Sequence, residues 1–285
     1  MPIRIICDDY CQLCNRFWAY LDSIGWAIKN NGHVYSLFWD ENIKDFDALR
    51  YSKYISFPSL DIYVADKGIK ICGWNLSKFL YARIVDSPMA HRFYKSAFSL
   101  KFGFIAGWPT RYNTENIPEH KIIKELFLPN TSFRNRVDSI FDEVIRDGYF
   151  IVGVHIRRGD YEHWENGKYF YTHEQYLNFM KQIAEIHNDK KICFFLASNE
   201  KIPPEFGDHF KTISIPNANA ATDLYALSRC DRLIGPPSTF SRWASFVSRI
   251  PIYFIFDSST TITSDNQFCP ISDHFHFEDG RKIPV

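Results

Sequence analysis

The sequence has no apolar run of the roughly 18 residues that a membrane-spanning helix requires, so no such helix is expected. Its first residues, MPIRIICDDYCQ, bring acids and cysteines too early for a secretory signal peptide. It also has no internal repeat, no low-complexity segment and no excess of either charge, since Lys plus Arg and Asp plus Glu number 33 each. A neutral chain has no general attraction for nucleic acid or anionic membranes. Any anion binding must therefore come from the local placement of charge.

The overall composition, with 46% hydrophobic and 23% charged residues, is typical of a globular protein. The 285 residues are enough for one large domain or two of ordinary size. Seven cysteines are an odd number and follow no small disulfide-scaffold pattern, which favours a reducing compartment. We therefore expect a cytoplasmic protein. We also expect a bacterial source, which the cysteine count does not itself indicate.

The stretch 151–161, which reads IVGVHIRRGDY, organises the rest of the chain. Its apolar first half predicts a strand buried on both faces, and charged residues follow directly where this strand ends. In open α/β sheets, ligands bind at the carboxyl edge of the strands. His155 and Arg157 are two positions apart, so their side chains should lie on the same side of the sheet. There the Arg157 guanidinium can donate two hydrogen bonds to a phosphate or a carboxylate. The alternative is that the two arginines belong to a structural ion-pair network.

The first half of the chain predicts a βαβ unit, with strands at 3–7 and 33–39 around a helix at 16–30. Between 40 and 115 the pattern is weaker and indicates strands at 61–64 and 69–72 and a helix at 76–84. An amphipathic helix then leads to the turn at Asp147-Gly148. We place the domain boundary there, which gives domains 1–147 and 148–285.

The second half alternates between strands and helices. Strands are expected at 149–156, 191–198, 212–215, 232–235 and 252–256. Helices are expected at 172–187, with Thr172 as N-cap, at 223–228, and at 240–248 after the tight loop 236–239. This order predicts an α/β protein in which two doubly wound, Rossmann-like domains face each other across a cleft.

Four segments in the expected order resemble the α1,2-fucosyltransferases of glycosyltransferase family 11, with similarity to α1,6- and protein-O-fucosyltransferases. The segment 154–161, VHIRRGDY, resembles the family's His-x-Arg-Arg-Gly-Asp motif. The segments 193–200, CFFLASNE, and 223–246, DLYALSRCDRLIGPPSTFSRWASF, resemble a Phe-Phe-x-x-Ser-Asp strand and an Asp-Leu-x-x-Met-Ser…Ser-Ser-Phe-Ser-Trp-Trp segment. The segment 14–17, CNRF, resembles the family's Gly-Asn-Gln/Arg loop.

This resemblance implies a GT-B fold, GDP-fucose as donor, a glycan acceptor, α1,2 linkage, inversion, and neither a metal nor another cofactor. It implies that the first domain binds the acceptor and the second the donor. By position it also assigns donor-binding roles: His155 and Asp223 to guanine, Arg157 to the diphosphate, Ser238 and Thr239 to a phosphate, and Asn15 to the cleft wall. The sequence departs from the family at Tyr10 and Cys14, where glycines are usual, and at the first Trp of the usual pair, because only Trp243 is present.

Transfer to a hydroxyl also needs a general base. The candidates beside the central strand are Asp160, Glu162, His163 and Glu165. We favour Glu165, which follows Arg157 at the spacing of the base in the α1,6 enzymes, and we expect Asp160 to hold the arginines. Rivals in the first domain are Asp9, Asp40 and Glu41.

Two other functions compete with this reading. Cys7, Cys11 and Cys14 have the C-x3-C-x2-C spacing with which radical S-adenosylmethionine enzymes hold an iron–sulfur cluster. The doubly wound second half argues against that class, whose members resemble a partial βα barrel. A non-catalytic binder of a nucleotide sugar or glycan is the third possibility, because binding and catalytic groups overlap in these motifs.

Overall fold

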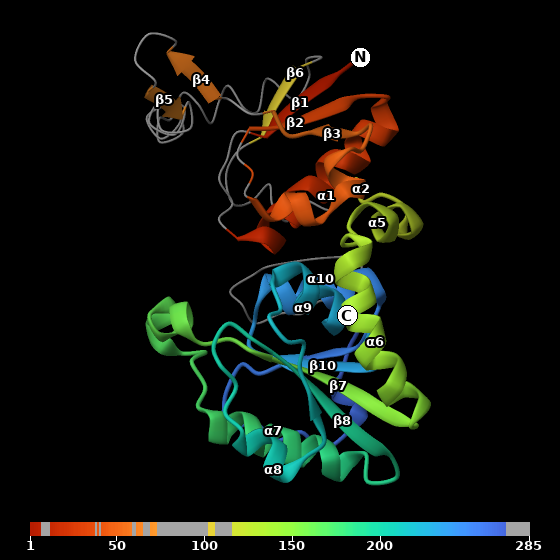
Figure 1. The fold of residues 1–285 in the computed structure, drawn as a ribbon, viewed down its shortest axis with the longest axis vertical. Helices are drawn as coiled ribbons and strands as arrows, with labels where there is room; N and C mark the ends of the chain where they lie inside the picture. The colour runs from red at the N-terminus through yellow and green to blue at the C-terminus, as the bar shows by residue number, and fades with distance from the viewer. Residues whose placement is uncertain are drawn as a thin grey trace. The chain divides into compact units, whose positions relative to one another are not determined.

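A computed structural model describes residues 1–6, 12–37, 39, 41–58, 61–64, 69–72, 102–105 and 116–271. The chain divides into two compact units, Met1–Leu128 and Pro129–Val285 (Figure 1). The expected boundary after Asp147 lies further along the chain. The difference arises because α6 (Thr131–Arg146) packs against β7 (Tyr149–Ile156) and α9 (Ala220–Leu227), and so belongs to the second unit.

The first unit contains the predicted βαβ unit. Strands β1 (Ile3–Ile6) and β2 (His33–Ser36) are parallel and are connected by α1 (Leu13–Asn30). The sheet is completed by β3 (Ile55–Ser56) and β6 (Phe102–Ile105), in the order β3-β2-β1-β6, with every pair parallel. Helix α1 ends at Asn31, whose φ of 47° is the left-handed conformation that the Asn-Asn-Gly sequence predicts.

The rest of the first unit is made of short elements. They are η1 (Glu41–Asp45), α2 (Asp47–Arg50), α5 (His120–Leu126) and the antiparallel pair β4 (Asp61–Val64) and β5 (Ile69–Cys72). The expected strands at 61–64 and 69–72 are therefore present. The expected helix at 76–84 lies outside the described residues.

The second unit is built on a five-stranded sheet in which every pair of neighbours is parallel. Its strands run in the order β11-β10-β7-β8-β9, with β8 at Lys191–Ser198, β9 at Thr212–Ile213, β10 at Arg232–Gly235 and β11 at Ile252–Phe254. From β7 the chain winds outward to β8 and β9, then returns across β7 to β10 and β11. The direction of winding thus reverses between β7 and β10. A doubly wound sheet binds its ligands outside the carboxyl ends of the strands at this point.

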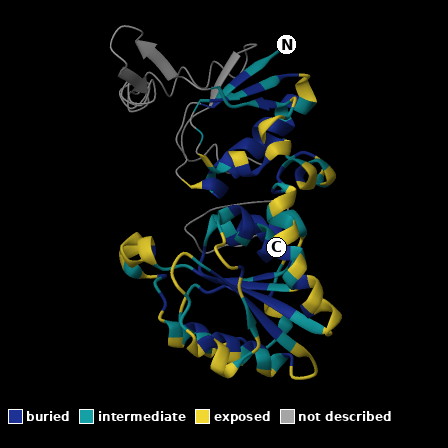
Figure 2. Cartoon of the chain, viewed as in Figure 1, coloured by how far each residue is buried: buried dark blue, intermediate teal, exposed yellow. Residues whose placement is uncertain are grey.

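Helices cover both faces of this sheet (Figure 1). One face carries α7 (His173–Ile186) and α8 (Glu205–His209), and the other carries α6, α9 and α10 (Thr239–Ser248). Helix α7 begins with a capping box between Thr172 and Gln175, as the N-cap prediction implies. The sheet is buried between the two layers, whose outer surfaces are exposed (Figure 2). No helix in the described part of the chain is long and apolar enough to cross a membrane.

Alternation along β7 divides its side chains between the two layers. Val152, Val154 and Ile156 belong to the core cluster that includes Tyr176 and Phe179 of α7. The intervening positions therefore face α9 and α10. A Cβ on one of them, Gly153, would lie 2.7–2.9 Å from Leu233, Cys230 and Leu227, so glycine lets the α9 segment pack directly on the strand.

Candidate active site

The candidate site lies where β7 and β10 end. Ile234 of β10 pairs with Val154 of β7, which brings Gly235 beside His155. A Cβ at Gly235 would lie 2.7 Å from the carbonyl oxygen and 2.9 Å from the Cβ of His155, so only glycine allows this approach without a shift. The segments 157–171 and 236–239 consequently leave the sheet side by side. These two segments contain three of the six predicted donor-binding residues, Arg157, Ser238 and Thr239.

His155 is a buried, neutral group on the α10 side of the sheet. It is 5% exposed, and its ring lies 5.3 Å from that of Phe240. Burial, together with the positive charge of Arg157, lowers the pKa of His155 to about 3. Its Nδ1 atom is buried and has no hydrogen-bond partner among the described residues. At neutral pH the ring therefore offers an unused polar atom to an uncharged ligand edge.

Arg157 extends from the end of β7 into the segment that follows. Its Nη2 atom donates to Oδ2 of Asp160 at 2.7 Å, and its guanidinium carbon lies 5.6 Å from the centre of the Tyr161 ring. The side chain remains 18% exposed, so it is neither turned into the core nor sealed off from a ligand. Asp160 thus orients Arg157, which is one of the roles the sequence indicated for it.

Arg158 has a different environment. Its Nε atom donates to Glu200 at 3.1 Å, its Nη1 atom donates to the carbonyl oxygen of Tyr171 at 2.6 Å, and its guanidinium lies over Phe170. Glu200 also accepts from the backbone N–H of Gly159 at 3.0 Å. Arg158 therefore belongs to a structural network that joins its loop to the end of β8 and to Tyr171, whereas the described ion pair of Arg157 is with Asp160 of the same loop.

Tyr161 joins the two loops, a role that was not predicted from the sequence. Its hydroxyl donates to the carbonyl oxygen of Pro237 at 2.6 Å, while its ring supports the Arg157 guanidinium. Burial raises the pKa of Tyr161 to about 12, although a hydrogen bond with Ser238 and the charge of Arg157 oppose that rise. The contact with Pro237 spans 76 residues of sequence, so only the fold could identify it. Through Tyr161, Arg157 is positioned relative to the 237–239 turn.

The 237–239 turn leads into the N-terminus of α10, and helix N-termini often bind anions. Ser238 is the N-cap residue, and its hydroxyl accepts from the backbone N–H of Phe240 at 3.1 Å. Thr239 is the first residue of the helix, and the first turn contains no acidic residue. Uncompensated N–H groups at such a terminus attract anions.

Arg242, in the same helix, is a second cation that the sequence did not reveal. It stands where the family usually has the first Trp of its pair, and it is 6% exposed with its guanidinium 5.2 Å from the Phe254 ring centre. Burial lowers the pKa of Arg242 to about 9, so it stays protonated at neutral pH. The charge of Arg242, like that of Arg157, lowers the pKa of the Tyr161 phenol against the larger effect of burial. Both cations therefore act at the same end of the sheet.

Asp223 lies in the first turn of α9, the helix that packs against α10. Burial raises the pKa of its carboxyl group from 3.8 to about 7. Across the described part of the chain, the carboxylate meets neither a hydrogen-bond donor nor a cation. It is thus a partly buried acceptor on the same side of the sheet as His155.

Within the second unit, no contact with Arg157 is described for the other predicted candidates for the base. Glu165 is exposed and lies on a left-handed turn with Asn166 and Gly167, and no contact with Arg157 is described for it. Glu162 and His163 are also exposed. Asn15 and Glu41 belong to the other unit. Asn15 is half-buried in the first turn of α1, and Glu41 is exposed in η1. Asp9, Asp40 and Tyr10 lie outside the described residues.

The cysteine-cluster hypothesis rests largely on positions outside the described residues. Cys7 and Cys11 are among these. Cys14 is only 2% exposed, within the first turn of α1. In the part of the chain that is described, no group of three His, Cys, Asp or Glu side chains could hold a metal ion.

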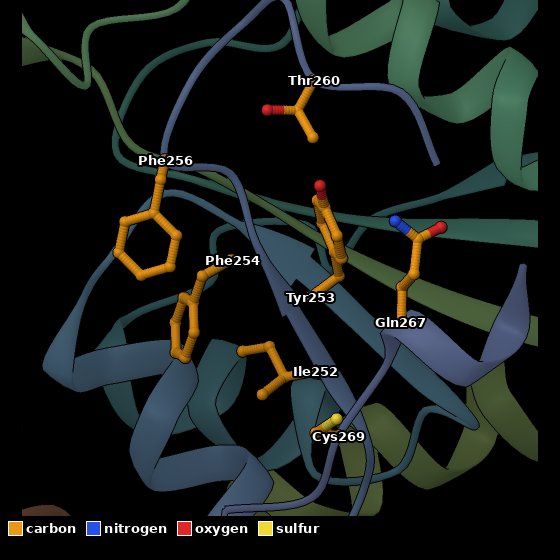
Figure 3. Close-up of a pocket in the computed structure, with 7 residues that line it drawn as sticks. All are labelled: Ile252, Tyr253, Phe254, Phe256, Thr260, Gln267 and Cys269. Atoms are coloured by element: carbon orange, nitrogen blue, oxygen red, sulfur yellow. The ribbon is translucent and has the colours of Figure 1, made fainter. Parts of the chain in front are cut away.

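A cavity of about 240 Å³ lies along the edge strand β11 (Figure 3). It is lined by Ile252, Tyr253, Phe254, Phe256, Thr260, Gln267 and Cys269. Tyr253 directs its hydroxyl toward Thr260, which leaves a mostly apolar hollow. None of the predicted site residues lines it, so we do not assign the donor site to this cavity.

Residues 132–267 match the family model described as Glycosyl transferase family 11. The matched range contains all of the predicted donor-binding residues except Asn15. No curated protein matches the sequence.

Several solved structures are similar in fold. Fucosyltransferase NodZ from Bradyrhizobium has 16% identity and a TM-score of 0.55, over 96% of this chain and 100% of that chain. A mutant of FUT1 from Arabidopsis thaliana, in complex with GDP, has 11% identity and a TM-score of 0.58, over 94% of this chain and 73% of that chain. POFUT1 in complex with GDP-fucose has 11% identity and a TM-score of 0.51, over 86% of this chain and 93% of that chain. Residues 132–267 thus match a model of the family that the sequence resembles, and the structures confirm the predicted α/β fold.

The raised pKa of Asp223 predicts a gain in stability for Asp223→Asn at high pH. A carboxyl group whose pKa is raised by folding destabilises the native state as the pH rises from 4 toward 7, because the buried group must then ionise. An amide avoids that cost, so the free energy of unfolding of Asp223→Asn should exceed that of the wild type by about 2 kcal/mol at pH 8, after allowance for partial exposure. The difference should vanish near pH 4. Melting temperatures of both proteins across this range measure it.

Glu174→Gln provides the matched control, because Glu174 is an exposed acid in the first turn of α7. It should show no gain at pH 8. An Asp223→Asn protein that melts with the wild type at every pH would contradict the buried, unpaired state of Asp223.

Proposed function

With residues 132–267 identified as a glycosyl transferase family 11 domain, we propose that this protein is a fucosyltransferase that moves L-fucose from GDP-fucose to a glycan hydroxyl. The observation that carries the proposal is the placement of Arg157 at the switch point of the second sheet, joined by Tyr161 to the start of α10. NodZ, FUT1 and POFUT1, which share the fold, are described as fucosyltransferases or as complexes with GDP or GDP-fucose, and this adds support.

The donor would be held by its base and its diphosphate. Guanine donates hydrogen bonds from N1 and N2, and Asp223 is an acceptor with no other described partner. Such a ligand would favour the ionised carboxylate and lower its pKa again. His155, neutral and with an unused ring nitrogen, would meet another part of the guanine edge. The Arg157 guanidinium would donate two hydrogen bonds to the diphosphate. The hydroxyl groups of Ser238 and Thr239 and the N–H groups at the start of α10 would bind it as well.

Two guanidinium groups would supply the electrostatic part of catalysis. As the bond to fucose breaks, negative charge accumulates on the departing GDP. Arg157 would bind that charge directly, and Arg242, buried behind Tyr161, would add to the positive potential. We therefore propose that transfer needs no metal ion and no cofactor other than the donor substrate.

The acceptor hydroxyl must lose a proton as it attacks the sugar. We propose Glu165 for this step, since it is a solvent-accessible carboxylate on the same loop as Arg157. A single displacement by that hydroxyl inverts the anomeric carbon. The α1,2 linkage is the one that the family resemblance favours, and the first unit would bind the acceptor.

A thermal-shift panel of GDP, UDP, CMP and S-adenosylmethionine tests the assignment of the donor. A ligand that binds only the native state raises its stability by mass action, by about 2.7 kcal/mol at a hundred times Kd. Only GDP should raise the melting temperature. A shift with S-adenosylmethionine alone would instead favour the iron–sulfur class. Release of GDP from GDP-fucose in the presence of a glycan then separates an enzyme from a non-catalytic binder.

Arg157→Ala should lower turnover by a factor of at least about 100, because it removes a donor aimed at the charge that grows on the leaving group. The fold should persist, since the Arg157 side chain is partly exposed and forms only one described ion pair. Arg157→Lys should recover part of the loss, because it keeps the charge without the fork. Steady-state rates with GDP-fucose measure this, and wild-type turnover in Arg157→Ala would remove Arg157 from the mechanism.

Glu165→Gln should lower turnover by roughly 100- to 10,000-fold, the usual contribution of a general base, while the Kd for GDP stays unchanged. Glu162→Gln is the matched control, since Glu162 is an exposed carboxylate in the same loop. Its turnover should stay close to that of the wild type. If Glu165→Gln also turns over normally, the base must be sought elsewhere.

A further inference from the structure

An indole ring is exposed on the loop that follows the central strand. Trp164, in η4 (Trp164–Gly167), is 41% exposed. The other exposed large hydrophobic residues in the described part of the chain are Met1, Tyr51 and Ile145, and none of them follows a strand at the carboxyl edge of a sheet. The turns that carry Trp164 form part of an exposed projection (Figure 2). Its position after a strand, at the edge of the sheet where doubly wound folds bind their ligands, makes Trp164 a candidate for a binding role.

Aromatic packing holds this ring in place. The centre of the Trp164 ring lies 4.7 Å from that of Tyr161 and 5.2 Å from that of Tyr169. Both tyrosines are buried, and Tyr169 contacts Phe256 in turn at 6.5 Å. The indole is thus fixed before any ligand arrives, so little side-chain entropy remains to be lost on binding.

The backbone beside Trp164 adopts an unfavourable conformation. Glu165, Asn166 and Gly167 have φ values of 51°, 57° and 75° in succession. The left-handed region costs a non-glycine residue of order 1–3 kcal/mol, and such strain concentrates at ligand-binding sites. This turn leaves the neighbouring side chains of His163, Glu165 and Asn166 exposed around the indole.

The ring is also close to the proposed reaction. Tyr161 contacts both partners, with the Arg157 guanidinium carbon at 5.6 Å and the Trp164 ring at 4.7 Å from its centre. The two distances together limit the separation of Arg157 and Trp164 to about 10 Å. That length is comparable to two linked monosaccharides, which are the transferred sugar and the sugar that receives it.

We propose that Trp164 is a binding platform for the acceptor, on which one pyranose ring stacks through its apolar C–H face. A pyranose has an apolar face and a rim of hydroxyl groups, and here an apolar ring is surrounded by exposed polar side chains. The proposal rests on the proposed function and extends it, because it gives the donor-binding unit a part in acceptor binding. It also brings the acceptor next to Glu165, the adjacent residue.

Saccharide binding can be measured separately from donor binding. Saturation-transfer NMR with lactose, N-acetyllactosamine, chitobiose and maltose, each with and without GDP, would follow the wild type, Trp164→Phe and Trp164→Ala. Trp164→Ala should weaken binding of at least one saccharide about tenfold, the equivalent of one aromatic contact, and Trp164→Phe should lose less. Tyr51→Ala, which removes a 72% exposed ring on the other unit, should bind saccharides like the wild type.

The Kd for GDP measures donor binding independently of saccharide binding. It should be the same in the wild type and in Trp164→Ala, and melting temperatures should confirm that both are folded. Equal saccharide binding by the two proteins, or no saccharide signal from the wild type, would overturn the platform. So would a loss of GDP affinity in Trp164→Ala as large as the loss of saccharide affinity. If the wild type binds a saccharide through Trp164 but does not bind GDP, the donor assignment fails and the platform stands.

Discussion

The hydrogen bond from the Tyr161 hydroxyl to the carbonyl oxygen of Pro237 is the interaction on which the candidate site depends. The sheet places the ends of β7 and β10 side by side, but it does not fix the loops that leave them. The Tyr161 hydroxyl connects the two loops, while its ring contacts both Arg157 and Trp164. A phenol is suited to this task because its two ends can serve an apolar and a polar contact at once.

Two polar groups of the second unit are poorly compensated by the described residues. His155 has a buried ring nitrogen without a described partner, and the Asp223 carboxyl group is held at a raised pKa by burial. Each arrangement costs stability, since buried polar groups are normally hydrogen-bonded. A ligand that donates to Asp223 and bonds to His155 would remove the cost, which is how a site can favour one nucleotide base over others.

The sequence predicted the strands of the second sheet well, because β7 and β8 are continuous apolar runs buried on both faces. It also indicated Arg157 and Ser238, because each directly follows such a strand. It could not indicate Tyr161, Arg242 or Trp164, whose roles depend on contacts between distant segments or on burial under other elements. The predicted domain boundary lies later than the division between the two compact units for a related reason. The amphipathic pattern of α6 shows that one of its faces is buried, but it does not show which unit covers that face.

The two adjacent arginines that follow β7 contact different groups. His155 lies on the α10 side of the sheet and is close enough to Arg157 for that charge to lower its pKa. Arg158, one position later, reaches Glu200 and the carbonyl oxygen of Tyr171, and its backbone bonds to Asn199 after β8. Arg158 therefore fastens the loop to the segment that follows β8, whereas Arg157 contacts Asp160 within its own loop. Successive side chains of extended backbone point to opposite faces, so two adjacent arginines can contact different groups.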